Sequence, residues 1–176
     1  MDEKARLVAA QKDPKEFRYF YDTYYKEVFL FIYRRTDDES ISADIAQQVF
    51  LKALQNIDRF EFRGTPFSSW LYRIANNEVM QFYRDAKKVR VVCIDQAGLQ
   101  DLMGDEDNQI DIEKREIAFA AIKKLSADDL ELIEMRYFEK RSFIEIGEIK
   151  NITANNAKVK VHRILDRIKK SITIEA

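Results

Sequence analysis

Apolar side chains recur at every third or fourth position along most of this chain, which is the period of helices that bury one face. In the N-terminal half this pattern predicts three helices, over residues 14–35, 42–60 and 67–88. The polar stretch Thr36–Ser40 separates the first two, and a loop ending at Pro66 precedes the third. Four glycines and two prolines in 176 residues leave few loops, so the pattern predicts an all-α protein.

The C-terminal half shows the same period. We predict a helix around residues 112–125 and a second helix that Ser126 caps, followed by a helical pair; together these four helices would close a small core. Between the halves, residues 89–109 carry many acids and two glycines, which argues against a core there. The chain therefore divides into a helical domain over 1–88, a linker over 89–109 and a second helical domain over 110–176.

The run from Ser142 to Lys170 has the pattern of a helix-turn-helix, a motif that lays its second helix in the DNA major groove. Gly147 stands where a missing side chain permits close packing, and Asn151 tolerates the left-handed conformation of a turn. Thr153 is the predicted N-cap of the second helix. The inner face of that helix is an apolar stripe of Ala157, Val161, Ile164, Leu165 and Ile168.

The outer face of the same helix carries side chains that suit DNA. Amides pair with adenine edges, and lysine or arginine pairs with guanine or phosphate. These side chains are Asn155, Asn156, Lys158, Lys160, Arg163, Arg167 and Lys169. A solvated charged face on an ordinary surface helix is the alternative interpretation, because such faces are common.

The net charge of −1 gives no indication of nucleic-acid binding, but the distribution of the charges does. Residues 157–170 hold six basic side chains against one acid, and residues 63–90 hold six against two. Local basic density is what phosphates respond to. The second zone overlaps a cluster of aromatic side chains, a mixture that holds single-stranded DNA when bases stack on rings. Phe67 and Trp70, however, share one helical stripe with Leu71 and Ile74, and we expect these four side chains in the core.

Other classes of function find little support. One cysteine and one histidine leave a zinc site improbable, and one cysteine excludes an internal disulfide. No apolar run approaches the roughly 20 residues that span a bilayer, and the first residues lack a signal-peptide core. No phosphate-binding glycine loop or nucleophile–base pair is present. We therefore expect a cytoplasmic protein that is not an enzyme, with no metal and no cofactor.

Two segments carry a family resemblance. ADIAQQVFLKALQNIDRF with GTPFSSWLYRIANN resembles the promoter-melting domain of bacterial extracytoplasmic-function (ECF) sigma factors of the sigma-70 family. The stretch from Leu125 to Lys170 is similar to the helix-turn-helix domain of the same family. The resemblance covers nearly the whole chain. It implies a subunit that binds core RNA polymerase, directs it to promoter DNA and helps to melt that DNA, with an anti-sigma factor as a possible further partner.

The resemblance also implies roles for residues at matching positions. Polymerase docking falls on Asp44, Gln47, Gln48 and Lys52. Capture and melting of the −10 element fall on the loop Phe60–Pro66 and on Arg63, Asn76, Asn77, Gln81, Arg84, Lys87 and Lys88. Reading of the −35 element falls on Thr153, Asn155, Asn156, Lys158, Val159, Lys160 and Arg163. The acidic linker looks like the segment that such factors thread through polymerase.

Two other classes of function stay open at this point. The chain could be a stand-alone helix-turn-helix regulator that binds duplex DNA without polymerase. It could also be a helical interaction protein that mimics a sigma factor and has no role on DNA.

Overall fold

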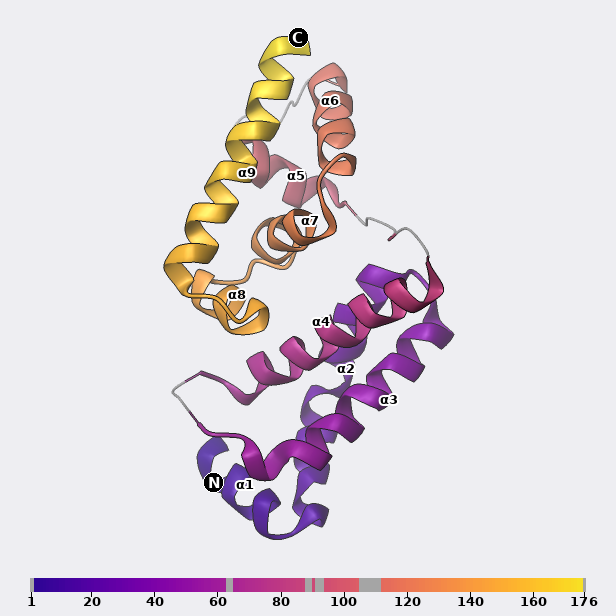
Figure 1. Cartoon of the computed structure of the whole chain (residues 1–176), viewed down its shortest axis with the longest axis vertical. Helices are drawn as coiled ribbons and strands as arrows, with labels where there is room; N and C mark the ends of the chain where they lie inside the picture. Colours follow the sequence, from indigo (N-terminus) through magenta and orange to yellow (C-terminus); the bar gives the residue numbers. More distant parts are fainter. Residues whose placement is uncertain (1, 63–64, 88–89, 91–93, 105–111, 176) are drawn as a thin grey trace. The chain divides into compact units, whose positions relative to one another are not determined.

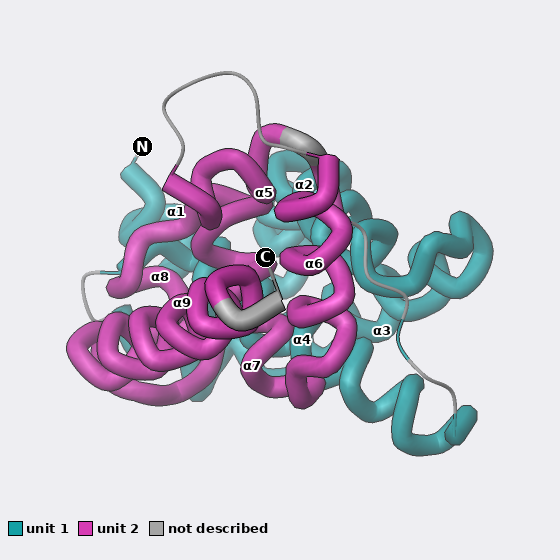
Figure 2. The backbone as a smooth tube through the Cα atoms, turned by 90° about the horizontal axis from the view of Figure 1, so that it is seen from above, with its two compact units in different colours: residues 1–93 teal, residues 94–176 magenta. Residues whose placement is uncertain are grey.

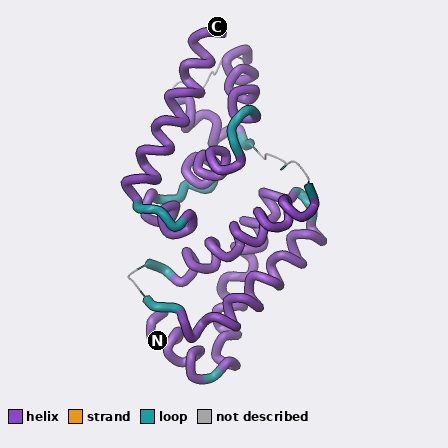
Figure 3. Tube along the Cα trace, viewed as in Figure 1, coloured by secondary structure: helices purple, strands orange, loops and turns teal. Residues whose placement is uncertain are grey.

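The computed structural model describes residues 2–62, 65–87, 90, 94–104 and 112–175. Within these ranges every regular element is a helix, and no strand occurs (Figure 3). The chain forms two compact units, Met1–Cys93 and Ile94–Ala176, which Figure 2 shows in separate colours. The predicted all-α class with two helical domains is confirmed.

The first unit is built around three long helices, α2 (Arg18–Thr36), α3 (Glu39–Asn56) and α4 (Phe67–Ala86), which pack against one another (Figure 1). The predicted break between the first two is confirmed. Asp37 adopts the left-handed conformation with φ 51°, and the Asp38 carboxylate then accepts a hydrogen bond from the Ile41 amide at 2.9 Å. Asp38 therefore caps α3 three residues earlier than the apolar pattern indicated.

Aromatic packing fills the interior of this unit. The rings of Phe20 and Phe67 lie 4.3 Å apart, and both side chains are fully buried. Ile32, Val49 and Leu71 complete the contact between the three helices at 0% exposure. The interpretation of Phe67 as a core residue is confirmed.

A short N-terminal helix, α1 (Glu3–Lys12), precedes these three and was not predicted. A 3-10 turn, Pro14–Phe17, joins it to α2, and a second 3-10 turn, Ile57–Arg59, follows α3. Only Leu7 and Ala10 of α1 are buried, so its apolar pattern is too sparse to reveal a helix.

The second unit consists of α5 (Gln96–Met103), α6 (Ile112–Lys123), α7 (Ala127–Ile133), α8 (Phe143–Lys150) and α9 (Ala154–Glu175). A π-helical turn, Glu134–Phe138, continues α7. Helix α9 packs against α6, α7 and α8, and its predicted apolar stripe is buried, at no more than 8% exposure. The four predicted helices are present and close a core.

The prediction of a linker without stable packing is wrong for residues 96–103. Asp95 caps α5 by accepting a hydrogen bond from the Gly98 amide at 2.6 Å. Leu99 and Leu102, three positions apart, are 1% and 2% exposed. Gly98 lies directly against the Phe138 ring, so the missing side chain permits the contact. The burial of two leucines on one face is enough to hold this helix in the core, although acids surround them in the sequence. The acidic composition of the whole segment concealed this short apolar pattern.

The helix-turn-helix forms as predicted. Ser142 and Glu145 make a reciprocal capping box at the start of α8. Asn151 adopts the left-handed conformation with φ 55°, and the chain then turns back over Gly147. A Cβ at Gly147 would lie 2.7 Å from the Ile152 carbonyl oxygen, so the close packing is with the backbone of the turn.

An ion cluster holds the end of α8 against α7. The Lys150 ammonium pairs with the Glu131 carboxylate and, at 2.8 Å, with Asp128. Burial lowers the pKa of Lys150, but the two carboxylates outweigh burial and raise it above its usual value. The hydrogen bond from Lys150 lowers the pKa of Asp128. The pKa shifts of Lys150 and Asp128 both favour the charged forms, which strengthens the tie between the end of α8 and α7.

Replacing Gly147 by alanine should destabilise the second unit. Alanine gains about 1 kcal/mol of helix propensity over glycine. The added methyl group collides with a backbone oxygen that belongs to the turn, and overpacking of this kind costs about 1–3 kcal/mol. We expect a net loss in free energy of unfolding, measured by urea titration; a gain would show that the turn moves aside freely.

Lys150→Met should cost about 3 kcal/mol of unfolding free energy, because it keeps the length of the side chain but leaves the buried Glu131 carboxylate without the ammonium. Asp128 is 67% exposed, so Asp128→Asn should cost less than about 1 kcal/mol. Equal losses for the two variants in chemical denaturation would contradict this ranking.

Candidate nucleic-acid interface

The start of α9 presents a polar surface opposite its buried stripe. The Thr153 hydroxyl accepts a hydrogen bond from the Asn156 amide at 3.1 Å, which confirms Thr153 as the N-cap. Ala157 and Val161 then point into the core at 0% exposure. The predicted DNA-facing set is correspondingly on the surface: Thr153, Asn155, Asn156, Lys158, Val159 and Arg163 are exposed and Lys160 is half-buried.

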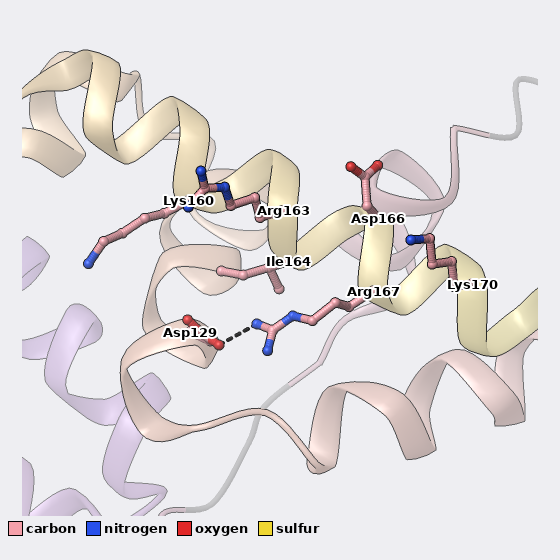
Figure 4. A pocket seen from close by; sticks show the side chains of 7 residues that line it. All are labelled: Asp129, Lys160, Arg163, Ile164, Asp166, Arg167 and Lys170. Carbon is pink, nitrogen blue, oxygen red and sulfur yellow. Dashed lines mark hydrogen bonds and ion pairs between the residues drawn. The ribbon is translucent and has the colours of Figure 1, made fainter.

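A basic hollow of about 460 Å³ follows further along the same helix, where α9 passes α7. Figure 4 shows the side chains that line it, which are Lys160, Arg163, Ile164, Asp166, Arg167 and Lys170 of α9 and Asp129 of α7. Arg167 forms an ion pair with Asp129, which ties that guanidinium to α7. Asp166 also lines the hollow, but Lys160, Arg163 and Lys170 outnumber it and leave a net positive lining that suits a phosphate.

In the first unit, the exposed face of α4 carries Asn77, Gln81 and Arg84, and Lys87 follows as the exposed C-cap in the left-handed conformation. Gln81 donates to the Asp85 carboxylate at 2.7 Å and accepts from the Arg84 guanidinium at 2.7 Å, so the three form one polar group on the surface. The roles predicted for Arg63 and Lys88 fall on residues outside those that the structure describes.

Asn76 does not belong to that face. Its side chain is 3% exposed, so the prediction that it contacts DNA is corrected. It lies four positions after Tyr72 and three before Val79, which are 7% and 0% exposed. The helical period therefore places Asn76 on the buried stripe and its neighbour Asn77 on the surface.

A second hollow, of about 340 Å³, lies between α4 on one side and α3 with its following 3-10 turn on the other. Trp70, Ile74 and Asn77, spaced four and three positions apart on α4, form one wall. Asn56 and Arg59 line the opposite side, with Lys52 and Glu78 at the same opening. An apolar wall with amide and cationic neighbours is a surface on which a flipped base can stack and accept hydrogen bonds.

Trp70 and Ile74 were predicted as core residues, yet both are half-buried and line this hollow. Phe60 supports Trp70 from behind, with ring centroids 4.9 Å apart. The spacing of Trp70, Ile74 and Asn77 along one helical face is the sequence signal that could have revealed the wall.

The predicted docking residues lie on α3. Asp44, Gln47 and Gln48 are exposed and line a hollow of about 410 Å³ together with Gln81 and Phe82 of α4. Lys52 is separate, because its ammonium pairs with the Glu78 carboxylate at 2.6 Å and it lines the second hollow, beside Trp70. The structure therefore brings three of the four predicted docking residues together.

Among the residues described, no helix has both the length and the apolar character needed to cross a bilayer. The same residues contain no group of three or more histidine, cysteine or acidic side chains placed to hold a metal ion.

Comparison with known proteins agrees with both halves of this arrangement. Residues 20–89 match the model for Sigma-70 region 2, and residues 121–170 match the model for Sigma-70, region 4. The chain is 31% identical to the ECF RNA polymerase sigma factor SigW of Bacillus subtilis, with 96% of each chain covered. It is 29% identical to the sigma factor YlaC of the same organism, over 87% of this chain and 90% of YlaC.

Solved structures share the fold. CnrH, in complex with the cytosolic domain of CnrY, superposes with a TM-score of 0.60 at 15% identity, covering 99% of each chain. The sigma factor RpoE of Bartonella quintana, in complex with the anti-sigma factor NepR, gives a TM-score of 0.55 at 19% identity, over 92% of this chain and 99% of RpoE. With both sigma-70 regions in order and a relative aligned from end to end, this chain belongs to the ECF sigma factors of bacterial RNA polymerase.

Proposed function

We propose that this protein binds core RNA polymerase, directs it to promoters by reading two DNA elements, and helps to melt the DNA for initiation. The observation that carries the proposal is the presence, in one chain, of an exposed recognition helix in one unit and, in the other, a hollow walled by Trp70, Ile74 and Asn77. A stand-alone regulator has a use for the first feature but not for the second.

The proposed reader of the −35 element is the start of α9. Asn155 and Asn156 in the first turn and Lys158 at the start of the second are exposed, at the end by which a recognition helix enters the major groove. Lys160 and Arg163 follow at the basic hollow, where phosphates of the same duplex would bind. We assign base contacts to the first group and mainly backbone contacts to the second.

The proposed −10 site is the hollow at Trp70, Ile74 and Asn77. Melting requires unstacking, which costs a few kcal/mol for an extruded base. Stacking on an aromatic side chain returns about 1–3 kcal/mol per base. The Asn77 amide lies at the same wall and can pair with a base edge. Gln81, Arg84 and Lys87 continue along α4 and would follow the strand toward the duplex.

The proposed polymerase contact is the surface of Asp44, Gln47 and Gln48 on α3. An exposed acid flanked by amides suits a basic and polar partner surface, since charge complementarity supports docking and register. Lys52 contributes indirectly in this proposal, by holding α3 to α4 through Glu78.

We further propose that the chain catalyses no reaction itself and acts in the cytoplasm, where polymerase transcribes. CnrH and RpoE were solved in complexes with the cytosolic domain of CnrY and with the anti-sigma factor NepR. By analogy, we propose that an anti-sigma factor sequesters this protein until it is needed.

Adding the protein to bacterial core polymerase should give transcripts from specific start sites on genomic DNA. Asp44→Arg with Gln47→Lys should reduce polymerase binding at least about tenfold, because like charges replace complementary ones at a desolvated contact. Pull-down of core polymerase and multi-round transcription measure the two effects.

The matched control is Asp22→Arg, which makes the same charge reversal at an exposed position of α2 and removes only a surface pair with Arg18. It should leave binding unchanged. A double variant that binds like the wild type would refute the docking surface, and a gel shift without polymerase on a palindromic site would favour a stand-alone regulator.

Lys160→Ala with Arg163→Ala should weaken duplex binding by the second unit and flatten its salt dependence. Each lost phosphate contact lowers the slope of log K against log salt by about 0.9. Lys114→Ala with Lys123→Ala removes two exposed charges from α6 and should leave the slope unchanged. An unaltered slope in the α9 variant, measured by fluorescence anisotropy at several salt concentrations, would refute the placement.

A further inference from the structure

We propose that the N-terminal helix α1 is a positioning element for the −10 site, in which Gln11 and Glu3 hold the two ends of the loop before α4 and thereby set base selectivity. The inference rests on the proposed function of the hollow at Trp70, and deepens it. Neither residue lines that hollow, so both would act through the loop and not on the base.

Gln11 binds the start of the loop. Its amide nitrogen donates to the Ile57 carbonyl oxygen at 3.0 Å and to the Phe60 carbonyl oxygen at 3.0 Å. The Ile57 carbonyl oxygen also accepts a hydrogen bond from the Phe60 amide at 3.0 Å, so Gln11 binds the 3-10 turn that follows α3 at its first residue and at its C-cap. One side chain therefore uses both of its donors to fix the direction in which the loop leaves α3.

Glu3 binds the end of the loop. One carboxylate oxygen accepts a hydrogen bond from the Phe67 amide, the first of α4, at 3.2 Å. Pro66 precedes that amide, and its side chain cannot accept a hydrogen bond, so Glu3 serves as a cap contributed from 64 residues away. A carboxylate also suits the positive end of the helix dipole.

Tyr24 of α2 orients Glu3. Its hydroxyl donates to the other carboxylate oxygen at 2.7 Å. Burial raises the pKa of Tyr24, and the hydrogen bond to the Glu3 carboxylate raises it further, so the hydroxyl keeps its proton and remains a donor. The carboxylate is thus held between α2 and α4.

The two loop ends are coupled to the hollow by aromatic contacts. The Phe60 and Phe67 rings lie 5.3 Å apart in an edge-to-face arrangement. Both also contact Trp70, at 4.9 Å and 5.3 Å between centroids. Because Trp70 forms the wall of the hollow, any shift of either loop end moves the surface on which the base would stack.

Helix α1 is itself firmly seated, which a positioning element requires. Leu7 and Ala10 are 3% and 1% exposed, and the Arg6 guanidinium stacks over the Tyr19 ring at 4.1 Å. Glu3 and Gln11 lie eight positions apart, near opposite ends of α1. One helix therefore contacts both ends of the loop.

The test uses holoenzyme reconstituted with the full chain and a set of promoters that carry each of the four bases at every −10 position. Gln11→Ala and Glu3→Ala should reduce discrimination at the captured base by about two- to tenfold, the factor that corresponds to the net contribution of one hydrogen bond. Discrimination at the −35 element should not change, because α1 belongs to the other unit.

Conservative variants separate positioning from general stability. Glu3→Gln keeps an acceptor for the Phe67 amide and should retain most of the discrimination. Gln11→Glu keeps the size of the side chain but offers carboxylate oxygens to two carbonyl oxygens, and should behave like Gln11→Ala. Lys4→Ala and Lys12→Ala, on exposed positions of the same helix, are the controls and should match the wild type.

A purely structural role would lower transcription from every promoter by the same factor and leave the ratios between bases unchanged. Unchanged −10 ratios in Gln11→Ala and Glu3→Ala would therefore overturn the inference, as would a loss shared equally by the −10 and −35 elements. If the wild-type holoenzyme itself showed no base preference in the −10 element, the proposed function of the hollow would fail, and the inference with it.

Discussion

Complete burial of one stripe on each of two long helices is the constraint on which the rest of this structure depends. Helix α4 buries Phe67, Leu71, Ala75 and Val79 at 0% exposure. Helix α9 does the same with Ala157 and Val161. Once a helix has one face without solvent contact, the opposite face is determined by the 3.6-residue period. The proposed DNA surfaces are therefore consequences of how the two cores are packed.

The same constraint explains why, within each unit, buried side chains hold the helices in place while exposed side chains form the proposed binding surfaces. In the second unit, the Lys150 cluster ties α8 to α7, and the close contact at Gly147 packs the turn onto α8, while the side chains opposite the buried stripe of α9 stay on the surface. In the first unit, Phe60 and Phe67 support Trp70, so a wall that a base can use is backed by core packing. Rigid support behind an exposed side chain is what precise recognition requires.

Sequence patterns located most helices, because a long apolar stripe with a period of 3.6 residues fits a helix that buries one face and fits no strand. They failed where burial rests on few residues. Helix α5 depends on Leu99 and Leu102 amid acids, and α1 on Leu7 and Ala10. The Asn76–Asn77 pair illustrates a finer limit, since a shift of one position moves a side chain by about 100° around a helix and separates the core from the surface.

The sequence by itself determined the all-α class, the helix-turn-helix with its Thr153 cap and Asn151 turn, and the family, because these depend on local period, capping chemistry and motif order. Only the tertiary structure decided that Trp70 and Ile74 line a hollow, that Lys52 pairs with Glu78, and that Glu3 caps a helix 64 residues away. Those facts join segments that are distant in the chain. Their geometry follows from packing, and no local pattern encodes it.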